Sequence, residues 1–138
     1  MPEAVKNAGV DLESAAAIDM REYIYNMPTL LAAADVFIGR AGSGTCNEVA
    51  VAGTPAILIP SPNVTDNHQE KNARVLTGNG AAVLLLEAQC SPQVLYQTMQ
   101  QLLEDPARCK EMSKKLRDMA VVDSAERICD IVQSLVKK

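Results

Sequence analysis

Short apolar runs alternate with stretches of helical periodicity through the first two thirds of the chain. The apolar runs predict strands at residues 17–23, 35–39, 56–60 and 82–86. Three of these runs lack apolar–polar alternation, as expected for parallel strands that are covered on both faces. The stretches between them predict helices at residues 27–33, 45–52 and 67–77, with lengths typical of connections between parallel strands. The pattern therefore predicts an α/β fold, a parallel sheet with flanking helices.

The last third of the chain is predicted to be helical. Ser91-Pro92 and Asp105-Pro106 each combine an N-cap residue with a proline at the first helical position, and the run from Asp123 to Glu126 fits a capping box. Apolar residues then recur at spacings of three and four in three stripes: Leu95, Met99 and Leu102; Cys109, Met112, Leu116 and Met119; Ala125, Ile128, Val132 and Leu135. Such stripes predict helix faces that pack into the core.

Length and composition narrow the class of protein. A chain of 138 residues with 48% hydrophobic and 22% charged residues is typical of one globular domain. A net charge of −4, no Trp and one Phe argue against a nucleic-acid partner. No run of 18 apolar residues and no signal peptide is found, so we expect a cytoplasmic location. The four cysteines form no C-x-x-C pair and predict reduced, buried thiols, and a single histidine makes a zinc site unexpected.

The most informative motif is the glycine-rich run from Ile38 to Glu48, where a predicted strand leads into a helix. A helix N-terminus exposes unpaired N–H groups, and glycines let a phosphate approach the backbone. A carboxylate one turn further in can accept hydrogen bonds from a ribose. These features suggest a nucleotide-diphosphate site. Two structural explanations stay open: the glycines supply positive φ angles, or Thr45 and Glu48 form a capping box.

Two further loops are predicted at the same sheet edge, where ligands bind in open α/β sheets. The loop from Pro60 leads into Asp66-Asn-His-Gln69, which is again a possible capping box. The amide of Gln69 is suited both to donate to and to accept from sugar hydroxyls, and His68 lies beside it. The loop from Tyr23 to Tyr25 is suited to hold a flat base through backbone N–H and C=O groups.

Taken in order, these motifs and their spacing resemble the carboxyl-terminal domain of the MurG family. The matching positions are Tyr23-Ile24, Ala34-Asp35, Arg40-x-Gly42-x-x-Thr45-x-x-Glu48, Gly53-x-Pro55, Pro60, Asp66-x-His68-Gln69-x-x-Asn72-Ala73 and Gly80-Ala81-Ala82. The family consists of peptidoglycan N-acetylglucosaminyltransferases, which transfer GlcNAc from UDP-GlcNAc to lipid I and so form lipid II for the bacterial cell wall. The resemblance covers nearly the whole chain.

The resemblance assigns a role to each site residue. It implies that the Ile24 backbone contacts uracil, that Glu48 binds the ribose hydroxyls, and that His68 and Gln69 face the GlcNAc hydroxyls. The diphosphate is expected along the turn that Arg40 opens and helps to order, at Gly42, Ser43, Gly44 and Thr45. The family's reaction inverts the sugar and needs no metal, so no cofactor is expected beyond the donor substrate.

The resemblance also implies that residues 1–138 are an incomplete carboxyl-terminal half of a two-domain GT-B enzyme with Rossmann-like domains. A Gly-Gly-Ser-type phosphate loop of this half is absent. The amino-terminal domain, with the expected catalytic base, the lipid I site and the membrane-docking patch, is absent too. We therefore expect this polypeptide alone to be inactive, and the complete enzyme to be peripheral on the inner face of the plasma membrane.

Other functions stay open at this stage. One is a donor-binding subunit of a split GlcNAc-transferase that works with a separate membrane partner. A UDP-sugar epimerase shares the two-domain fold, but Arg40-Ala-Gly-Ser-Gly-Thr45 fits its glycine pattern poorly. A non-enzymatic nucleotide-binding module ranks last.

Overall fold

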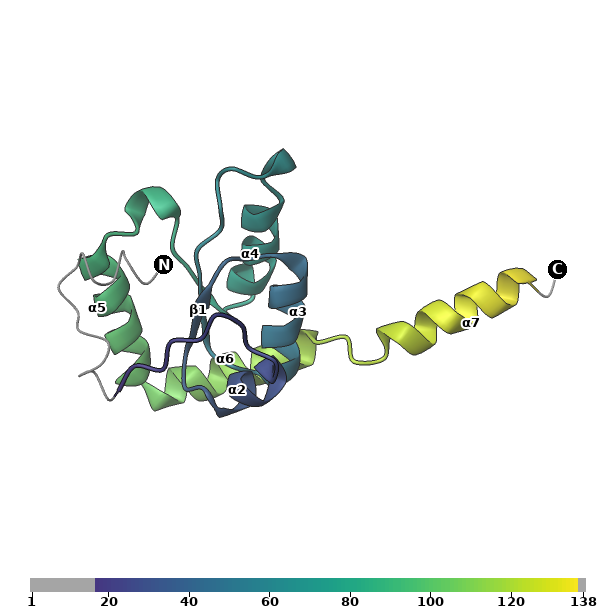
Figure 1. Ribbon diagram of the computed structural model, residues 1–138, viewed down its shortest axis with the longest axis horizontal. Coiled ribbons are helices and arrows are strands. Elements are labelled where there is room, and N and C mark those ends of the chain that lie inside the picture. The colour runs from purple at the N-terminus through teal and green to yellow at the C-terminus, as the bar shows by residue number, and fades with distance from the viewer. Residues whose placement is uncertain (1–16, 137–138) are drawn as a thin grey trace.

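The computed structural model describes residues 17–136, and it confirms a parallel sheet with flanking helices (Figure 1). The strands are β1 (Phe37–Gly39), β2 (Ala56–Leu58) and β3 (Val83–Leu84). The helices between and after them are α2 (Met27–Ala33), α3 (Ser43–Ala52), α4 (His68–Gly78), α5 (Pro92–Leu103), α6 (Pro106–Met119) and α7 (Ser124–Val136). Two short 3-10 helices, η1 (Thr65–Asn67) and η2 (Glu87–Gln89), lie in the loops after β2 and β3.

All three strands run in the same direction, in the order β1-β2-β3. Ile57 in β2 pairs with Ile38 on one side and with Val83 on the other. Because the strands are parallel and in register, the loops that follow them leave the sheet at one edge. The glycine-rich turn and the loop from Pro60 leave the sheet at this edge, as predicted. The loop at residues 23–25 follows no strand and precedes α2, so the prediction that it leaves the sheet at this edge is wrong.

The predicted strand at residues 17–23 is wrong. This segment forms no strand, and its apolar side chains are largely in solvent, with Ile18 49% and Tyr23 68% exposed. A strand is stable only when a neighbour accepts its backbone hydrogen bonds. Among the described residues the sheet consists of β1, β2 and β3 alone, so residues 17–23 pair with no strand.

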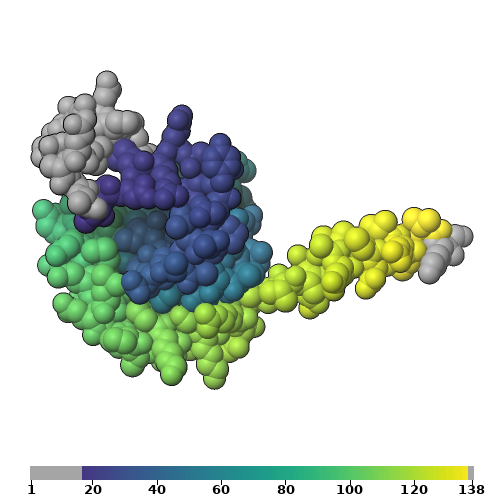
Figure 2. All heavy atoms as spheres, turned by 60° about the horizontal axis from the view of Figure 1, so that its bottom comes forward, coloured from purple at the N-terminus to yellow at the C-terminus, as the bar shows by residue number. Residues whose placement is uncertain are grey.

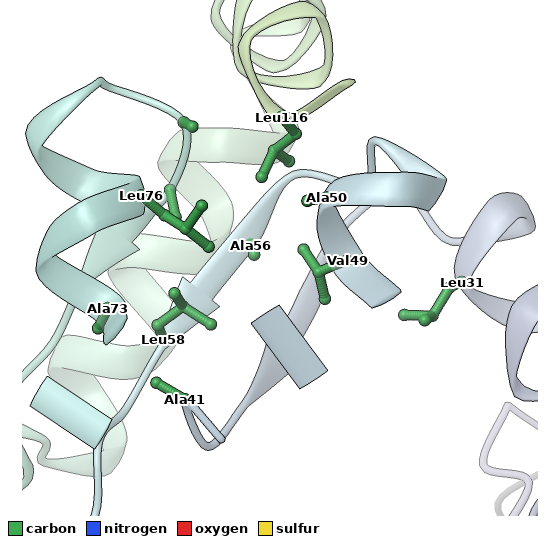
Figure 3. Packing of buried hydrophobic residues seen from close by; sticks show 11 residues of the cluster. Leu31, Ala41, Val49, Ala50, Ala56, Leu58, Ala73, Leu76 and Leu116 are labelled. Carbon is green, nitrogen blue, oxygen red and sulfur yellow. The ribbon is translucent and has the colours of Figure 1, made fainter. Parts of the chain in front are cut away.

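The core lies on both faces of β2, whose residues are completely buried. Ala56 and Leu58 point to one face, where α2, α3 and α4 supply most of the packing (Figure 3). Ile57 points to the other face, against Leu102 of α5 and Met112 of α6. This is why the run was apolar without alternation: both faces of the strand are covered.

The predicted starts of the last three helices are confirmed. Ser91 caps α5 by accepting a hydrogen bond from the backbone N–H of Val94 at 3.2 Å. Asp105 caps α6 by accepting from the N–H of Arg108 at 3.0 Å, and α7 begins directly after Asp123. The apolar stripes of α5 and α6 also reach the core as predicted, through Leu102, Met112 and Leu116.

The stripe on α7 is the exception. This helix projects away from the rest of the molecule (Figures 1 and 2), and Ile128, Val132 and Leu135 are 61%, 52% and 68% exposed. The helical period was read correctly, but no described element covers that face. Cys129 on α7 is exposed as well, which corrects the prediction of four buried thiols, while the other three cysteines are half-buried. No helix within residues 17–136 is long and apolar enough to cross a membrane.

The end of α3 gives a test of the fold. Gly53 closes this helix in the left-handed conformation, with φ of 69°, and a Cβ there would lie 2.5 Å from Nε of Arg117. Gly53→Ala is therefore expected to lower the free energy of unfolding by about 1–3 kcal/mol. Urea unfolding measures this loss.

The matched control is Gly78→Ala. Gly78 is helical and has no atom within 4 Å of its Cβ position. Alanine there should leave the free energy of unfolding unchanged or raise it by up to about 1 kcal/mol. Equal stabilities of the Gly53→Ala variant and the parent chain would contradict the role given to the αL cap.

Candidate functional site

The glycine-rich turn ends in an uncapped helix N-terminus. Helix α3 begins at Ser43, two residues earlier than predicted, and Gly42 is its N-cap with φ −62° and ψ 151°. The first helical hydrogen bond runs from Cys46 N to Gly42 O at 2.9 Å. The N–H groups of the three preceding residues thus have no acceptor within the helix, and Gly42 has no side chain to cap them. With no acidic residue in the first turn, this end of α3 is suited to bind an anion.

The glycines of this turn are not explained by the fold. Gly42 and Gly44 do not have the positive φ angle that would require glycine; among the described glycines only Gly53 and Gly80 do. Packing does not exclude a side chain either. The nearest atom to a Cβ on Gly42 is Oγ1 of Thr45 at 3.9 Å, and a Cβ on Gly44 would meet nothing within 4 Å. The space beside both glycines is therefore open.

The structure also decides against a capping box at Glu48. Thr45 is the third residue of α3 and not its cap, so Glu48 lies in the second turn. Its side chain is exposed, and within residues 17–136 it makes no hydrogen bond or ion pair. The carboxylate is thus available to a ligand.

The second predicted capping box, Asp66 to Gln69, is wrong as well. The N-cap of α4 is Asn67, which has φ of 50° and makes no side-chain cap bond. Asp66 pairs with Lys71 at 2.7 Å. The Asn67 amide donates to Glu70 at 2.7 Å, and this bond, together with one from Arg74, holds the pKa of Glu70 below its ordinary value. Side-chain bonds within the loop therefore fix the start of α4.

His68 and Gln69 present opposite hydrogen-bonding groups. Nδ1 of His68 lies 2.9 Å from the carbonyl oxygen of Thr65, so Nδ1 carries the proton and Nε2 of the neutral ring is an acceptor. Oε1 of Gln69 accepts from the backbone N–H of Ser61 at 2.9 Å, which leaves the NH₂ group to donate. The amide of Gln69 was expected both to donate and to accept; the structure assigns the acceptor to the loop after β2.

Helix α4 also holds the glycine-rich turn in place. Nδ2 of Asn72 donates to the carbonyl oxygen of Ala41 at 3.1 Å, and the Ala41 side chain is completely buried. Asn72 follows His68 by four residues, a spacing that puts both on one face of the helix. That spacing was the signal in the sequence, but Asn72 was not among the predicted site residues.

A second residue that the sequence did not reveal is Glu87. Its carboxylate pairs with Arg40, whose Nη1 also donates to the carbonyl oxygen of Ile59 at 3.2 Å. Arg40 and Glu87 are 47 residues apart, so only the parallel register of the sheet brings them together.

The predicted residues lie around several neighbouring hollows and not in one cavity. Ser43 lines a hollow of about 250 Å³ between α3 and α4, where burial raises the pKa of the Cys46 thiol. Glu48 lines another, of about 410 Å³, between α2 and α3. A third, of about 650 Å³, lies between the loops after β2 and β3 and includes Glu87.

Ile24 stands apart from these groups. It is half-buried in the irregular segment before α2, between Tyr23 and Tyr25, whose rings touch edge to face with centroids 4.7 Å apart. No hydrogen bond joins Ile24 to the other predicted residues within residues 17–136. Hydrogen bonds thus join α4 to the glycine-rich turn and to the loop after β2. Within the described residues, none joins them to residues 23–25, the segment expected to bind the base.

Comparisons with known proteins agree on one family. The model of the glycosyltransferase family 28 C-terminal domain matches residues 2–128. A UDP-N-acetylglucosamine–N-acetylmuramyl-(pentapeptide) pyrophosphoryl-undecaprenol N-acetylglucosamine transferase of Acetivibrio thermocellus is 41% identical over 120 residues, which are 87% of this chain and 32% of the relative. A protein of the same name from Desulforamulus reducens is 38% identical over 135 residues, which are 98% of this chain and 36% of the relative.

A solved structure supports the same grouping. The crystal structure of Acinetobacter baumannii MurG matches with a TM-score of 0.82 and 32% identity, over 96% of this chain and 38% of that one. The chain therefore spans about a third of the length of the relatives that it matches.

Proposed function

We propose, because this chain belongs to the glycosyltransferase family 28 C-terminal domains, that it binds the sugar donor. In this proposal it is the donor-binding part of an N-acetylglucosaminyltransferase that acts in peptidoglycan synthesis. Its fold is that of the C-terminal part of MurG, a GT-B glycosyltransferase. In this proposal the donor is UDP-GlcNAc and the acceptor is lipid I. A longer polypeptide supplies the acceptor site, the catalytic base and the contact with the cytoplasmic face of the membrane.

One observation carries the proposal: within residues 17–136 the first three N–H groups of α3 have no acceptor, and they lie beside glycines that have open space around them and that the fold does not require. A glycine in a helix costs up to about 1 kcal/mol relative to alanine, so Gly44 is better explained by a ligand that approaches the backbone. A diphosphate fits this position because its oxygens accept hydrogen bonds and its charge is attracted by the positive end of the helix dipole.

The same arrangement helps the transfer step. When the bond between GlcNAc and the diphosphate breaks, negative charge grows on the departing UDP. N–H groups already aimed at these oxygens stabilise that charge without rearrangement, and this is the contribution expected of Ser43, Gly44 and Thr45. The proposal needs no metal for this purpose.

The remaining roles are part of the proposal. Glu48 accepts hydrogen bonds from the ribose, since its carboxylate is exposed and unpaired within the described residues. Nε2 of His68 accepts from one sugar hydroxyl, and the NH₂ group of Gln69 donates to another. The Ile24 backbone hydrogen-bonds to uracil. This role requires residues 23–25 to lie close to the N-terminus of α3 when the donor is bound.

A titration of the chain, followed amide by amide in NMR spectra, tests this function. UDP should shift the signals of residues 43–45 and of Ile24, and UDP-GlcNAc should additionally shift His68 and Gln69. UDP-glucose, which lacks the acetamido group, should bind more weakly than UDP-GlcNAc. Saturation by UDP with no further effect of the sugar would instead favour a nucleotide-binding module, and shifts elsewhere would overturn the proposal.

The role of Glu48 is tested by Glu48→Gln. Loss of a charge-assisted hydrogen bond to the ribose should weaken UDP binding by about 1–3 kcal/mol, measured by calorimetry. Because Glu48 is exposed and has no partner, the free energy of unfolding should change by less than about 0.5 kcal/mol. Glu104→Gln, an exposed position at the end of α5, is the control and should bind UDP like the parent chain. A large loss of stability with intact UDP affinity would contradict the assigned role.

Gly44→Ala should change stability and binding in opposite directions. Alanine favours the helix and meets no atom, so the free energy of unfolding should rise by up to about 1 kcal/mol. The added methyl group lies where the diphosphate is proposed, so UDP affinity should fall at least about tenfold, or 1.4 kcal/mol. Gly78→Ala controls for the helix effect alone. Undiminished UDP affinity in Gly44→Ala would show that the ligand does not approach this backbone.

A further inference from the structure

A single guanidinium group connects the ends of all three strands. Arg40 directly follows β1, and its Nη1 donates to the carbonyl oxygen of Ile59, the residue after β2, at 3.2 Å. The same nitrogen pairs with the carboxylate of Glu87, which lies three residues after β3 and begins η2. The sheet's own hydrogen bonds stop just before, at Ile59 N to Gly39 O and Leu85 N to Leu58 O, 2.8 and 3.0 Å. Beyond that point the strand ends are held by Arg40.

We propose that Glu87 is a positioning residue of the donor site, acting through Arg40. This inference rests on the proposed function, because it concerns the placement of the N–H groups that bind the diphosphate. Arg40 is separated from the N-cap, Gly42, by one residue. Whatever fixes Arg40 therefore fixes the direction in which the turn leaves β1 and the direction in which α3 begins.

The turn is held from two sides. On one side Ala41 is buried and its carbonyl oxygen accepts from Asn72 of α4. On the other side Arg40 is held by Glu87 and Ile59. Without the Glu87 carboxylate, Arg40 keeps only a neutral carbonyl partner, and its long side chain regains rotational freedom. The turn would then be fixed through α4 alone.

The pair is placed to affect the turn more than the stability of the fold. The side chains of Arg40 and Glu87 are 53% and 44% exposed, and ion pairs at such positions contribute little to folding. The charges of Arg40 and Glu87 also distinguish positioning from simple charge neutralisation. If Glu87 only neutralised Arg40, its removal would leave a positive charge beside the diphosphate and would strengthen UDP binding. Positioning predicts the opposite sign.

The test compares Glu87→Gln with the parent 138-residue chain by two measurements, UDP affinity and amide hydrogen exchange. UDP affinity should fall roughly 2- to 5-fold, the range expected from the loss of one exposed ion pair. The amide of Cys46, whose N–H closes the first turn of α3 on the carbonyl oxygen of Gly42, should exchange at least about threefold faster, while the melting temperature changes by less than about 2 °C. Glu111→Gln breaks a similar exposed pair, with Lys115 on α6, and should match the parent chain in every measurement.

A double variant shows whether Glu87 acts through Arg40. If it does, Arg40→Gln combined with Glu87→Gln should bind UDP no more weakly than Arg40→Gln alone. A further loss in the double variant, tighter UDP binding by Glu87→Gln, or unchanged exchange at Cys46 would each overturn the inference. If the parent chain binds no UDP, the proposed function fails, and the exchange rates still decide whether Glu87 orders the turn.

Discussion

The parallel register of three short strands is the constraint on which the site depends. β2 is buried on both faces and pairs with β1 and β3 on its two sides, so the loops after all three strands meet at one edge. Polar groups far apart in sequence then lie within hydrogen-bonding distance there: Arg40 and Glu87, and Asn72 and Ala41. A change that disturbed the packing of β2 would disturb both contacts together.

Helix α4 links structure and proposed chemistry. Three residues near its start have separate tasks: Asn72 holds the glycine-rich turn, Gln69 holds the loop after β2, and His68 is oriented by Thr65. In each case one polar atom is used by the protein, and for His68 and Gln69 another is left for a ligand. Preorganisation of this kind limits the ordering that a bound donor would have to impose.

The sequence was sufficient for what depends on local pattern. β1, β2, β3, their intervening helices and the caps at Ser91 and Asp105 were all predicted, because periodicity and capping chemistry are local. It was insufficient where the outcome depends on a distant partner. Residues 17–23 look like a strand but have none beside them, α7 looks like a core helix but is uncovered, and nothing local marks Glu87. The capping boxes considered at Thr45–Glu48 and Asp66–Gln69 also failed, since spacing alone does not say which residue begins a helix.

Helix α7 has a consequence for how the chain unfolds. Helix α7 buries no side chain, so its unfolding exposes little apolar surface that was packed against residues of α2 to α6. The free energy of unfolding of α2 to α6 therefore depends little on whether α7 is folded. The cooperative unit thus runs from α2 to α6, and the slope of a denaturation curve will report the surface of that unit only. An isolated helix of 13 residues is marginal in water, so α7 is expected to fray at temperatures where the sheet and its helices are still intact.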